Sequence, residues 1–391
     1  MRTRGQTGNT KFVKQMNREG ILYQLKQKRM SRAELAAETK LSRPCISSLV
    51  DEMIGEGLIR EIGTGQSRGG RKPVLLEYNS QAYAVVGAVY EGNCIHMAIA
   101  DLHGHILSRY QARLKPPADG EKALAALEAG LTKLLGQCSF ERSQLHGIGI
   151  GLPGITERNK GTISFAPSTG WMGQPVRQAL EERLGLPVFI DNDVNMMTIG
   201  EFYQGAGRGA KNLIQIYVGS GIGAGIVING QLYRGSKEAA GEIGYMMIGP
   251  FRNRSQREYG VFESNFGVPG ILSKAQPLLP SWEEGAPILP QLQAAAAEGH
   301  PEARALLQDT YRHWAFGMAN VASIMDPELL VLGGEMIHLD EQGLQTIQEL
   351  LSRLIPVVPV IKTASLGDQA GIIGAVHCVL ESFPNHRSWS E

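Results

Sequence analysis

The sequence predicts an α/β protein of two domains, a small helical head (residues 1–79) followed by a larger body (residues 80–391). The charge is divided in nearly the same way, because residues 1–75 hold 15 Lys and Arg against 7 Asp and Glu, and the rest hold 23 against 31. The periodicity changes too, from short amphipathic helices to apolar strands, helices and glycine-rich turns. A basic head attracts phosphate backbones and an acidic body repels them, so the two domains are expected to do different jobs.

Composition narrows the class of protein further. A chain of 391 residues with 43% hydrophobic residues supports large packed cores rather than general disorder. We find no N-terminal apolar signal segment and no apolar run near 18 residues, so we expect a cytoplasmic protein without a membrane segment. The four cysteines lie far apart and form no C-x-x-C pair, which predicts reduced thiols and no metal site: Cys45, Cys94, Cys138 and Cys378.

The head has the pattern of three helices. Apolar residues at helical spacing predict the first, as one helix or as two short helical turns, over residues 12–29. Ser31-Arg32-Ala33-Glu34 is a capping box that opens a short second helix. After a turn, Ser42 is a good N-cap and Pro44 falls in the first turn of a third helix ending near Gly55. Two short helices joined by a tight turn predict a helix-turn-helix, which places its second helix in the major groove of DNA.

The third helix and a basic loop carry the candidate DNA contacts. Arg43 can read guanine edges, and Ser47 and Ser48 can meet bases or phosphates. Residues 58–63 and 73–78 predict a hairpin, and its glycine-rich loop is a wing able to enter a minor groove. The alternative is an ordinary helical subdomain followed by a flexible basic linker. The residues expected to contact double-stranded DNA are Ser31, Arg32, Ser42, Arg43, Pro44, Ser47, Ser48, Arg68, Arg71 and Lys72.

The body predicts a sheet whose strand ends carry polar groups. Strand-like segments at 84–89, 94–100 and 106–114 precede a helix over 120–137 and a buried strand at 145–152. The later segment 188–195 reads VFIDNDVN, an apolar strand that ends in two acids and two amides. Such a strand end can hold several sugar hydroxyls, and an acid there can act as a general base. The alternative is a capped turn before a helix.

A glycine-rich hairpin over residues 214–228 is a further candidate for ligand binding in the body. Its turn can cradle a phosphate through backbone N–H groups, although tight packing explains the glycines equally well.

Together the segments resemble the ROK family of sugar-responsive repressors and sugar kinases. The motifs that carry the resemblance are GIGLPG (149–154), APSTGW (166–171), DNDVN (191–195), GSGIGAGIVINGQLYRG (219–235), AAGEIG (239–244), DPELLVLGG (326–334) and GIIGA (371–375).

The resemblance implies a two-lobed, actin-like (ribonuclease H-like) sugar-binding domain with a cleft between its lobes. Lobe I would comprise about 80–191 plus 370–391, and lobe II about 192–369. The helix-turn-helix and the wing SRGGRKP (67–73) place the chain with the repressor branch, of the xylose-repressor type. Carried onto matching positions, the sugar-binding residues would be Ser168, Asn192, Asp193, Glu242, Tyr245 and Glu263.

Two departures from the family pattern bear on chemistry. The kinases open with a D-x-G-x-T phosphate loop, but here Val89 replaces the acid, Asn93 replaces the threonine, and Glu91 would repel a polyphosphate. The family's zinc site is missing as well, because Tyr245 replaces its histidine and residues 249–263 contain no cysteine. From the resemblance and these two departures we therefore expect no kinase activity, no catalytic residues, and no metal or other cofactor.

We therefore expect a sugar-responsive transcriptional regulator, a repressor of carbohydrate-utilisation genes that a sugar releases from operator DNA. A homodimer or higher oligomer would present two recognition helices to two half-sites. Two alternatives stay open. One is a sugar kinase with an accessory DNA-binding head, which Asp193 favours and Glu91 opposes. The other is a regulator controlled by a protein partner.

Overall fold

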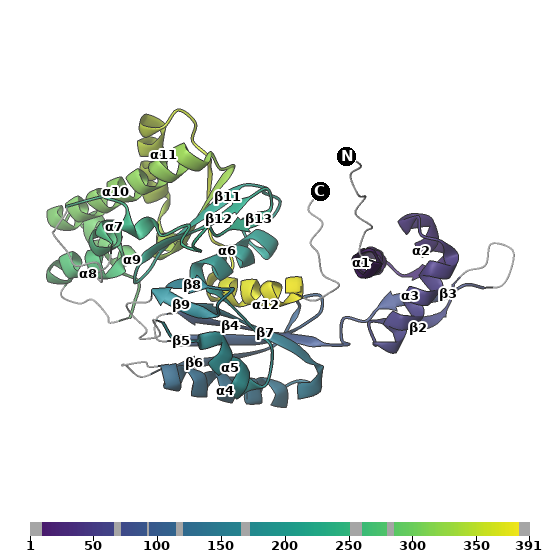
Figure 1. Ribbon diagram of the computed structural model, residues 1–391. Coiled ribbons are helices and arrows are strands. Elements are labelled where there is room, and N and C mark those ends of the chain that lie inside the picture. Colours follow the sequence, from purple (N-terminus) through teal and green to yellow (C-terminus); the bar gives the residue numbers. More distant parts are fainter. Residues whose placement is uncertain are drawn as a thin grey trace, which may run out of the picture.

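The computed structural model describes residues 10–65, 72–91, 94–114, 120–165, 173–250, 260–279 and 285–382, with the backbone alone described for residues 10, 11 and 165. Figure 1 shows a small N-terminal head beside a body built from two sheets. The mixed α/β architecture and the two-sheet body confirm the predicted fold class. Within the described residues no helix is both long and apolar enough to cross a membrane.

The head is a helix-turn-helix with a small antiparallel sheet. The predicted capping box is present, since the Ser31 hydroxyl accepts from the Glu34 amide and the Glu34 carboxylate accepts from the Ser31 amide. Ser42 caps the third helix, and Pro44 lies in its first turn, as predicted. The predicted hairpin is confirmed, with a third short strand that the sequence did not suggest. The elements are α1 (Thr10–Gln27), β1 (Met30–Ser31), α2 (Arg32–Thr39), α3 (Arg43–Gly55), β2 (Ile59–Thr64) and β3 (Val74–Tyr78).

The first lobe of the body is a five-stranded sheet in the order β10-β7-β4-β5-β6. The strands are β4 (Ala84–Glu91), β5 (Cys94–Asp101), β6 (Ile106–Arg113), β7 (Leu145–Leu152) and β10 (Val188–Asn192), with a separate hairpin of β8 (Ile155–Glu157) and β9 (Thr162–Phe165). Helices α4 (Gly120–Gly136) and α5 (Val176–Leu184) cover one face. Strands β4, β7 and β10 run parallel, so their carboxyl ends lie at one edge.

The second lobe is a five-stranded sheet in the order β13-β12-β11-β14-β15. Its outer face packs on helices around the buried Trp314. The strands are β11 (Leu213–Val218), β12 (Ile222–Ile228), β13 (Gln231–Tyr233), β14 (Leu329–Gly334) and β15 (Val360–Thr363). The helices are α7 (Val261–Phe266), α8 (Val268–Ala275), α9 (Ile288–Ala297), α10 (Pro301–Met325) and α11 (Glu341–Leu354). Short 3-10 turns are η1 (Arg142–Gln144), η2 (Ile243–Tyr245), η3 (Gln276–Leu278), η4 (Glu335–His338) and η5 (Gly367–Gln369).

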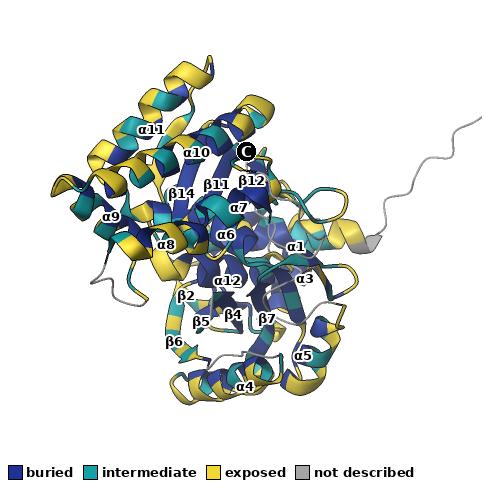
Figure 2. Cartoon of the chain, turned by 90° about the vertical axis from the view of Figure 1, so that its left-hand side faces the viewer, coloured by how far each residue is buried: buried dark blue, intermediate teal, exposed yellow. Residues whose placement is uncertain are grey.

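Two buried helices lie between the sheets, α6 (Asp193–Gln204) and α12 (Ala370–Ser382). They approach so closely that a Cβ on Gly200 would lie 2.0 Å from the Ala370 carbonyl oxygen, and one on Gly374 would lie 1.7 Å from the Met196 carbonyl oxygen. Only glycine fits at these two positions. Figure 2 shows the pair as part of one buried layer with the strands. Because α6 begins directly after β10, its first turn stands at the strand ends of lobe I and faces lobe II.

Candidate functional site

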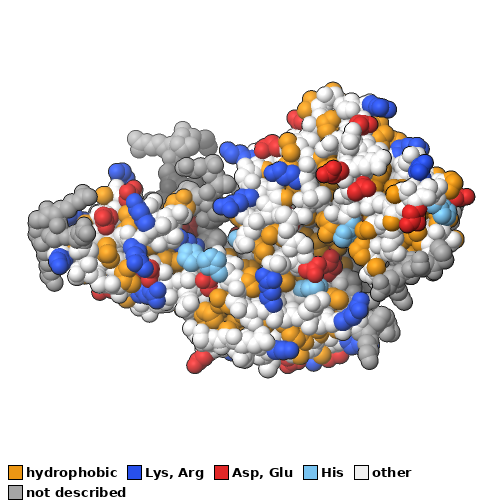
Figure 3. Space-filling model, turned by 180° about the vertical axis from the view of Figure 1, so that it is seen from behind, with side chains coloured by type: hydrophobic (Ala, Val, Ile, Leu, Met, Phe, Trp, Pro, Cys, Tyr) orange, Lys and Arg blue, Asp and Glu red, His pale blue; other side chains and the backbone are white. Residues whose placement is uncertain are grey.

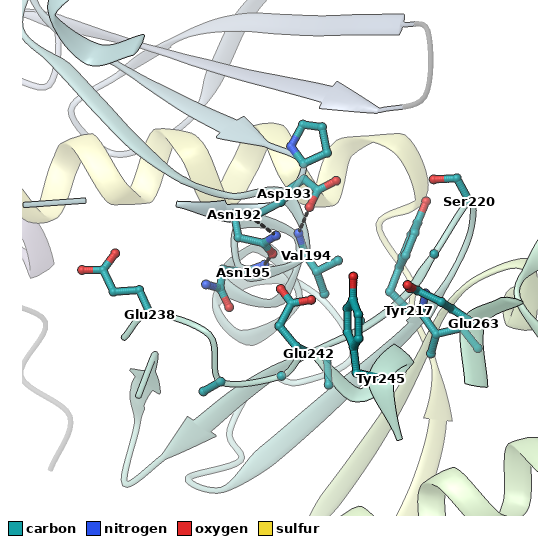
Figure 4. Close-up of a pocket in the computed structure, with 18 residues that line it drawn as sticks. Asn192, Asp193, Val194, Asn195, Tyr217, Ser220, Glu238, Glu242, Tyr245 and Glu263 are labelled. Carbon is teal, nitrogen blue, oxygen red and sulfur yellow. Dashed lines mark hydrogen bonds between the residues drawn. The ribbon is translucent and has the colours of Figure 1, made fainter. Parts of the chain in front are cut away.

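A cavity of about 130 Å³ lies between the two lobes at the start of α6. This volume is close to that of roughly 150 Å³ cavities that hold one small molecule. Four segments form its wall (Figure 4): the turn after β7, the first turn of α6, the β11–β12 turn, and residues 238–245. Glu263 of α7 completes it. The cavity brings together five of the six residues predicted to bind sugar: Asn192, Asp193, Glu242, Tyr245 and Glu263. The sixth, Ser168, lies outside the described residues.

Asn192 and Asp193 are held by the start of α6. The Asn192 side chain caps the helix by accepting from the Asn195 amide at 3.1 Å, and it donates to the Gly154 carbonyl at 3.1 Å. One Asp193 oxygen accepts from the Val194 amide at 2.9 Å. Burial raises the pKa of Asp193 to about 6, and the charge of Glu91 adds to the rise. Asp193 is therefore a fixed hydrogen-bond acceptor that titrates near neutral pH.

Glu242 and Glu263 come from lobe II but do different things. Burial raises the pKa of Glu242 to about 7, with further rises from the charges of Glu263 and Asp193. Glu263 is 8% exposed, and its two oxygens accept from the amides of Gly260 at 2.8 Å and Ile222 at 3.1 Å. The structure therefore gives Glu263 the role of holding the β11–β12 turn in place, whereas Glu242 borders the cavity as a candidate ligand for the sugar.

Asn195, one of the two amides of the predicted strand end, also lines the cavity, and Tyr217 and Glu238 are polar wall residues that the sequence analysis did not single out. Tyr217 donates its hydroxyl to Glu91 at 2.6 Å, which joins β11 to β4 across the cleft. Strand alternation could have found it, because Tyr217 stands two residues before the glycine-rich turn. Glu238 accepts from the Arg158 backbone amide at 2.7 Å and has a φ of 55°. Nothing in the sequence pattern marks this loop residue.

Asp191 does not line the cavity, although we expected both acids of the strand end to face the sugar. It is 2% exposed and accepts from the Asn195 side chain at 2.9 Å. Two guanidinium nitrogens of Arg234 lie 2.8 Å from its other oxygen, and Arg158 lies 3.7 Å away. Because Arg234 belongs to lobe II, Asp191 forms a buried ion pair between the lobes.

In the head, most of the predicted DNA contacts on α3 are accessible. Ser42, Arg43, Pro44 and Ser48 are exposed and Ser47 is partly exposed, and Lys72 is exposed beside β3. Lys and Arg side chains gather on the face of the head seen in Figure 3. Arg68 and Arg71 lie outside the described residues, so their role stays a prediction.

Two predicted contacts at the start of α2, Ser31 and Arg32, need correction. Ser31 is only 4% exposed, and its hydroxyl is used in the capping box, so it is not free to meet DNA. Arg32 lies 2.6 Å from Asp51 and 3.3 Å from Glu61. To bind a DNA phosphate, Arg32 would have to leave these two carboxylates. The predicted interface therefore narrows to the start of α3 and to the wing.

No group of three or more His, Cys, Asp or Glu among the described residues is arranged to hold a metal ion. Residues 251–259, which correspond to most of the family's zinc loop, lie outside the described ranges. The absence of a zinc site therefore stays a prediction from the sequence. The described residues of the cleft instead offer acids, amides and hydroxyls, the groups that bind sugar hydroxyls.

Comparison with known proteins agrees with this architecture. The ROK family model matches residues 87–382, and the chain belongs to the ROK family. It is 31% identical to the xylose repressor of Caldicellulosiruptor bescii, over 97% of this chain and all of that protein. It is 30% identical to the glucokinase of Halalkalibacterium halodurans, over 74% of this chain and 92% of the kinase. The crystal structure of a ROK family transcriptional regulator, a homologue of the Escherichia coli MLC protein, matches in fold with a TM-score of 0.77, covering 95% of this chain and 97% of that one at 24% identity.

Proposed function

We propose that this protein is a sugar-responsive transcriptional repressor. The observation that carries the proposal is the union in one chain of a helix-turn-helix head and an interlobe cavity lined by hydroxyl-binding groups. The relatives support it, because the xylose repressor aligns with 97% of the chain, whereas the glucokinase aligns with 74%. DNA bound by the head and sugar bound in the cavity would be thermodynamically linked, so each weakens the other by the same factor.

We infer further that the protein is not a sugar kinase. Phosphoryl transfer needs a phosphate that is positioned and neutralised beside the sugar. At this place Val89 provides no carboxylate, and the acidic side chain of Glu91 accepts a hydrogen bond from the Tyr217 hydroxyl across the cleft. Incubation with ATP, Mg²⁺ and glucose or xylose tests this inference. We expect no sugar phosphate, and turnover near that of a true glucokinase would contradict it.

The cavity favours an uncharged monosaccharide as the effector. Four carboxylates line it, and none of the described residues in its wall is Lys, Arg or His. Sugar hydroxyls can donate to these carboxylates, whereas a phosphate group would meet like charge. Calorimetry with xylose, glucose and glucose 6-phosphate separates these classes. We expect a neutral sugar to bind and the phosphate ester to bind at least about tenfold more weakly than glucose. Tighter binding of the phosphate ester would contradict this choice of effector. Binding of none would favour control by a protein partner.

The DNA-binding half of the proposal rests on α3 and the wing. Arg43→Ala should weaken operator binding by about 1–3 kcal/mol and relax base preference, because Arg43 would lose a base contact. Lys72→Ala should weaken binding to all sequences alike and reduce the salt dependence. Gel-shift titrations at two salt concentrations measure both effects, with Arg312→Ala, an exposed residue of α10, as the control. Operator binding by Arg43→Ala that equals wild type would refute α3 as the recognition helix.

A further inference from the structure

Helix α6 reaches from the sugar cavity to the joint between head and body. Its first residues, Asp193, Val194 and Asn195, line the cavity. Its last two residues, Tyr203 and Gln204, lie at the opposite end, ~18 Å away for a helix of this length. Figure 1 places α6 beside α12 in the middle of the body. A shift at the first turn therefore moves groups far from the sugar, provided that the helix moves as a unit.

The far end of α6 is tied to α12 through His377. The Tyr203 ring stacks on the His377 ring, with centroids 4.2 Å apart and planes 9° from parallel. The Tyr203 hydroxyl donates to Glu381 at 2.7 Å. The Gln204 amide nitrogen lies 3.3 Å from His377 Nε2 and can only donate, so His377 accepts and is neutral. Burial lowers the pKa of His377 to about 4, which agrees with this neutral form at physiological pH.

The contact between Gln204 and His377 also lies next to the β5–β6 turn, on which the head sits. A Cβ on Gly104, in the β5–β6 turn, would lie 3.9 Å from both Gln204 Nε2 and His377 Nε2. The adjacent His103 meets the Tyr78 ring edge-on at 5.1 Å, and Tyr78 is the last residue of the head's sheet. Lys26 of α1 lies 5.1 Å above that ring. Figure 3 shows histidine side chains where head and body meet.

Buried apolar packing continues across this joint. Tyr78 shares one cluster with Leu102 of the β5–β6 turn and with Val376 and Leu380 of α12. The backbone adds a link, because the Leu102 amide donates to the Ser80 carbonyl at 2.9 Å. Closely packed groups of this kind move between discrete arrangements rather than deforming smoothly. The head is therefore seated on residues next to those that the end of α6 touches.

We propose that α6 transmits sugar occupancy to the DNA-binding head through the contact of Tyr203 and Gln204 with His377. The inference rests on the proposed function, since it describes how the two sites of that repressor are linked. Sugar bound at Asn192 and Asp193 shifts α6 along α12. The close glycine contacts at Gly200 and Gly374 favour sliding over separation. The Tyr203–His377–Gln204 contact then moves the β5–β6 turn, and with it Tyr78 and the head.

The test measures sugar affinity in the free protein and in the operator complex, and takes the ratio of the two dissociation constants. In wild type we expect a ratio of about 5 to 150, the usual range for coupled sites. In Gln204→Ala and Tyr203→Ala we expect the ratio to fall toward 1, while sugar affinity of the free protein stays within about threefold. Tyr203→Phe keeps the ring stacking and should restore most of the ratio. Gln345→Ala, on exposed α11, is the matched control and should keep the wild-type ratio.

The outcomes separate this inference from the proposed function. A wild-type protein that binds no sugar or no operator DNA refutes the proposed function itself. A wild type with strong coupling and a folded Gln204→Ala variant with the same coupling refutes only the role of α6. If Tyr203→Ala does not fold, Gln204→Ala still decides the question, because the Gln204 side chain is exposed and its loss leaves the core intact.

Discussion

The two ends of the interlobe cleft differ although they lie side by side. At the sugar end, Asp193 and Glu242 border the cavity with pKa values raised to about 6 and about 7. At the end where a kinase holds phosphate, Val89 is apolar and Glu91 is bonded to Tyr217 of the opposite lobe. The first end therefore offers acceptors for hydroxyl groups. At the second end, the acid is already hydrogen-bonded to the opposite lobe. Under the proposed function, this cleft keeps the groups that recognise a sugar and lacks those that phosphorylate it.

The strongest test of the sugar end is Asp193→Asn. This change removes a charged acceptor from the first turn of α6, and hydrogen bonds to charged groups contribute about 1.5–3 kcal/mol. We expect sugar affinity to fall by about 10- to 100-fold, measured by calorimetry, while sugar-free operator affinity stays unchanged. Asp309→Asn, at an exposed position of α10, is the control. A loss smaller than about threefold would mean that Asp193 does not bind the sugar.

Glu242→Gln should weaken sugar binding by about tenfold and raise the melting temperature at pH 8. The pKa of Glu242 in the folded protein, about 7, exceeds the ordinary value of 4.5, so the folded state holds this proton more tightly than the unfolded state. The resulting stabilisation is complete below about pH 4.5 and is lost as the pH rises through 7. Gln carries no charge to bury at pH 8. Thermal unfolding checks this, and a lower melting temperature would contradict the assigned burial of Glu242.

Sugar binding should also depend on pH. Hydroxyl groups donate more strongly to a carboxylate than to a carboxylic acid, so the bound sugar favours ionised Asp193 and Glu242. Binding then releases protons, and affinity should rise by about fivefold between pH 5.5 and 8. Calorimetry in buffers of different ionisation enthalpy measures the released protons directly. Proton uptake, or affinity that falls over this range, would show that the protonated acids bind the sugar.

The sequence predicted local features well because their causes are local. The Ser31 capping box, the Ser42 cap with Pro44, and the strand that ends at Asn192 each depend on neighbours within a few residues. The family resemblance supplied Glu242, which borders the cavity. The partners that Asp191 and Glu238 find in the opposite lobe could not be predicted in this way. Asp191 looked like a second sugar acid, but its partner Arg234 is distant in sequence, and Glu238 is held by the backbone amide of Arg158, which belongs to the other lobe.

The smallest effect should come from the phosphate end. Glu91→Gln keeps an acceptor for the Tyr217 hydroxyl but removes a negative charge that raises the pKa of Asp193. We therefore expect sugar affinity at pH 8 to change by less than about threefold, and the midpoint of its pH dependence to move to lower pH. No kinase activity should appear, because Val89 still supplies no carboxylate. An unchanged midpoint of the pH dependence would show that the charge of Glu91 does not influence the ionisation of Asp193. A large loss of sugar affinity would show instead that the Glu91–Tyr217 bond shapes the cavity, so that the closed phosphate end would be part of the sugar site.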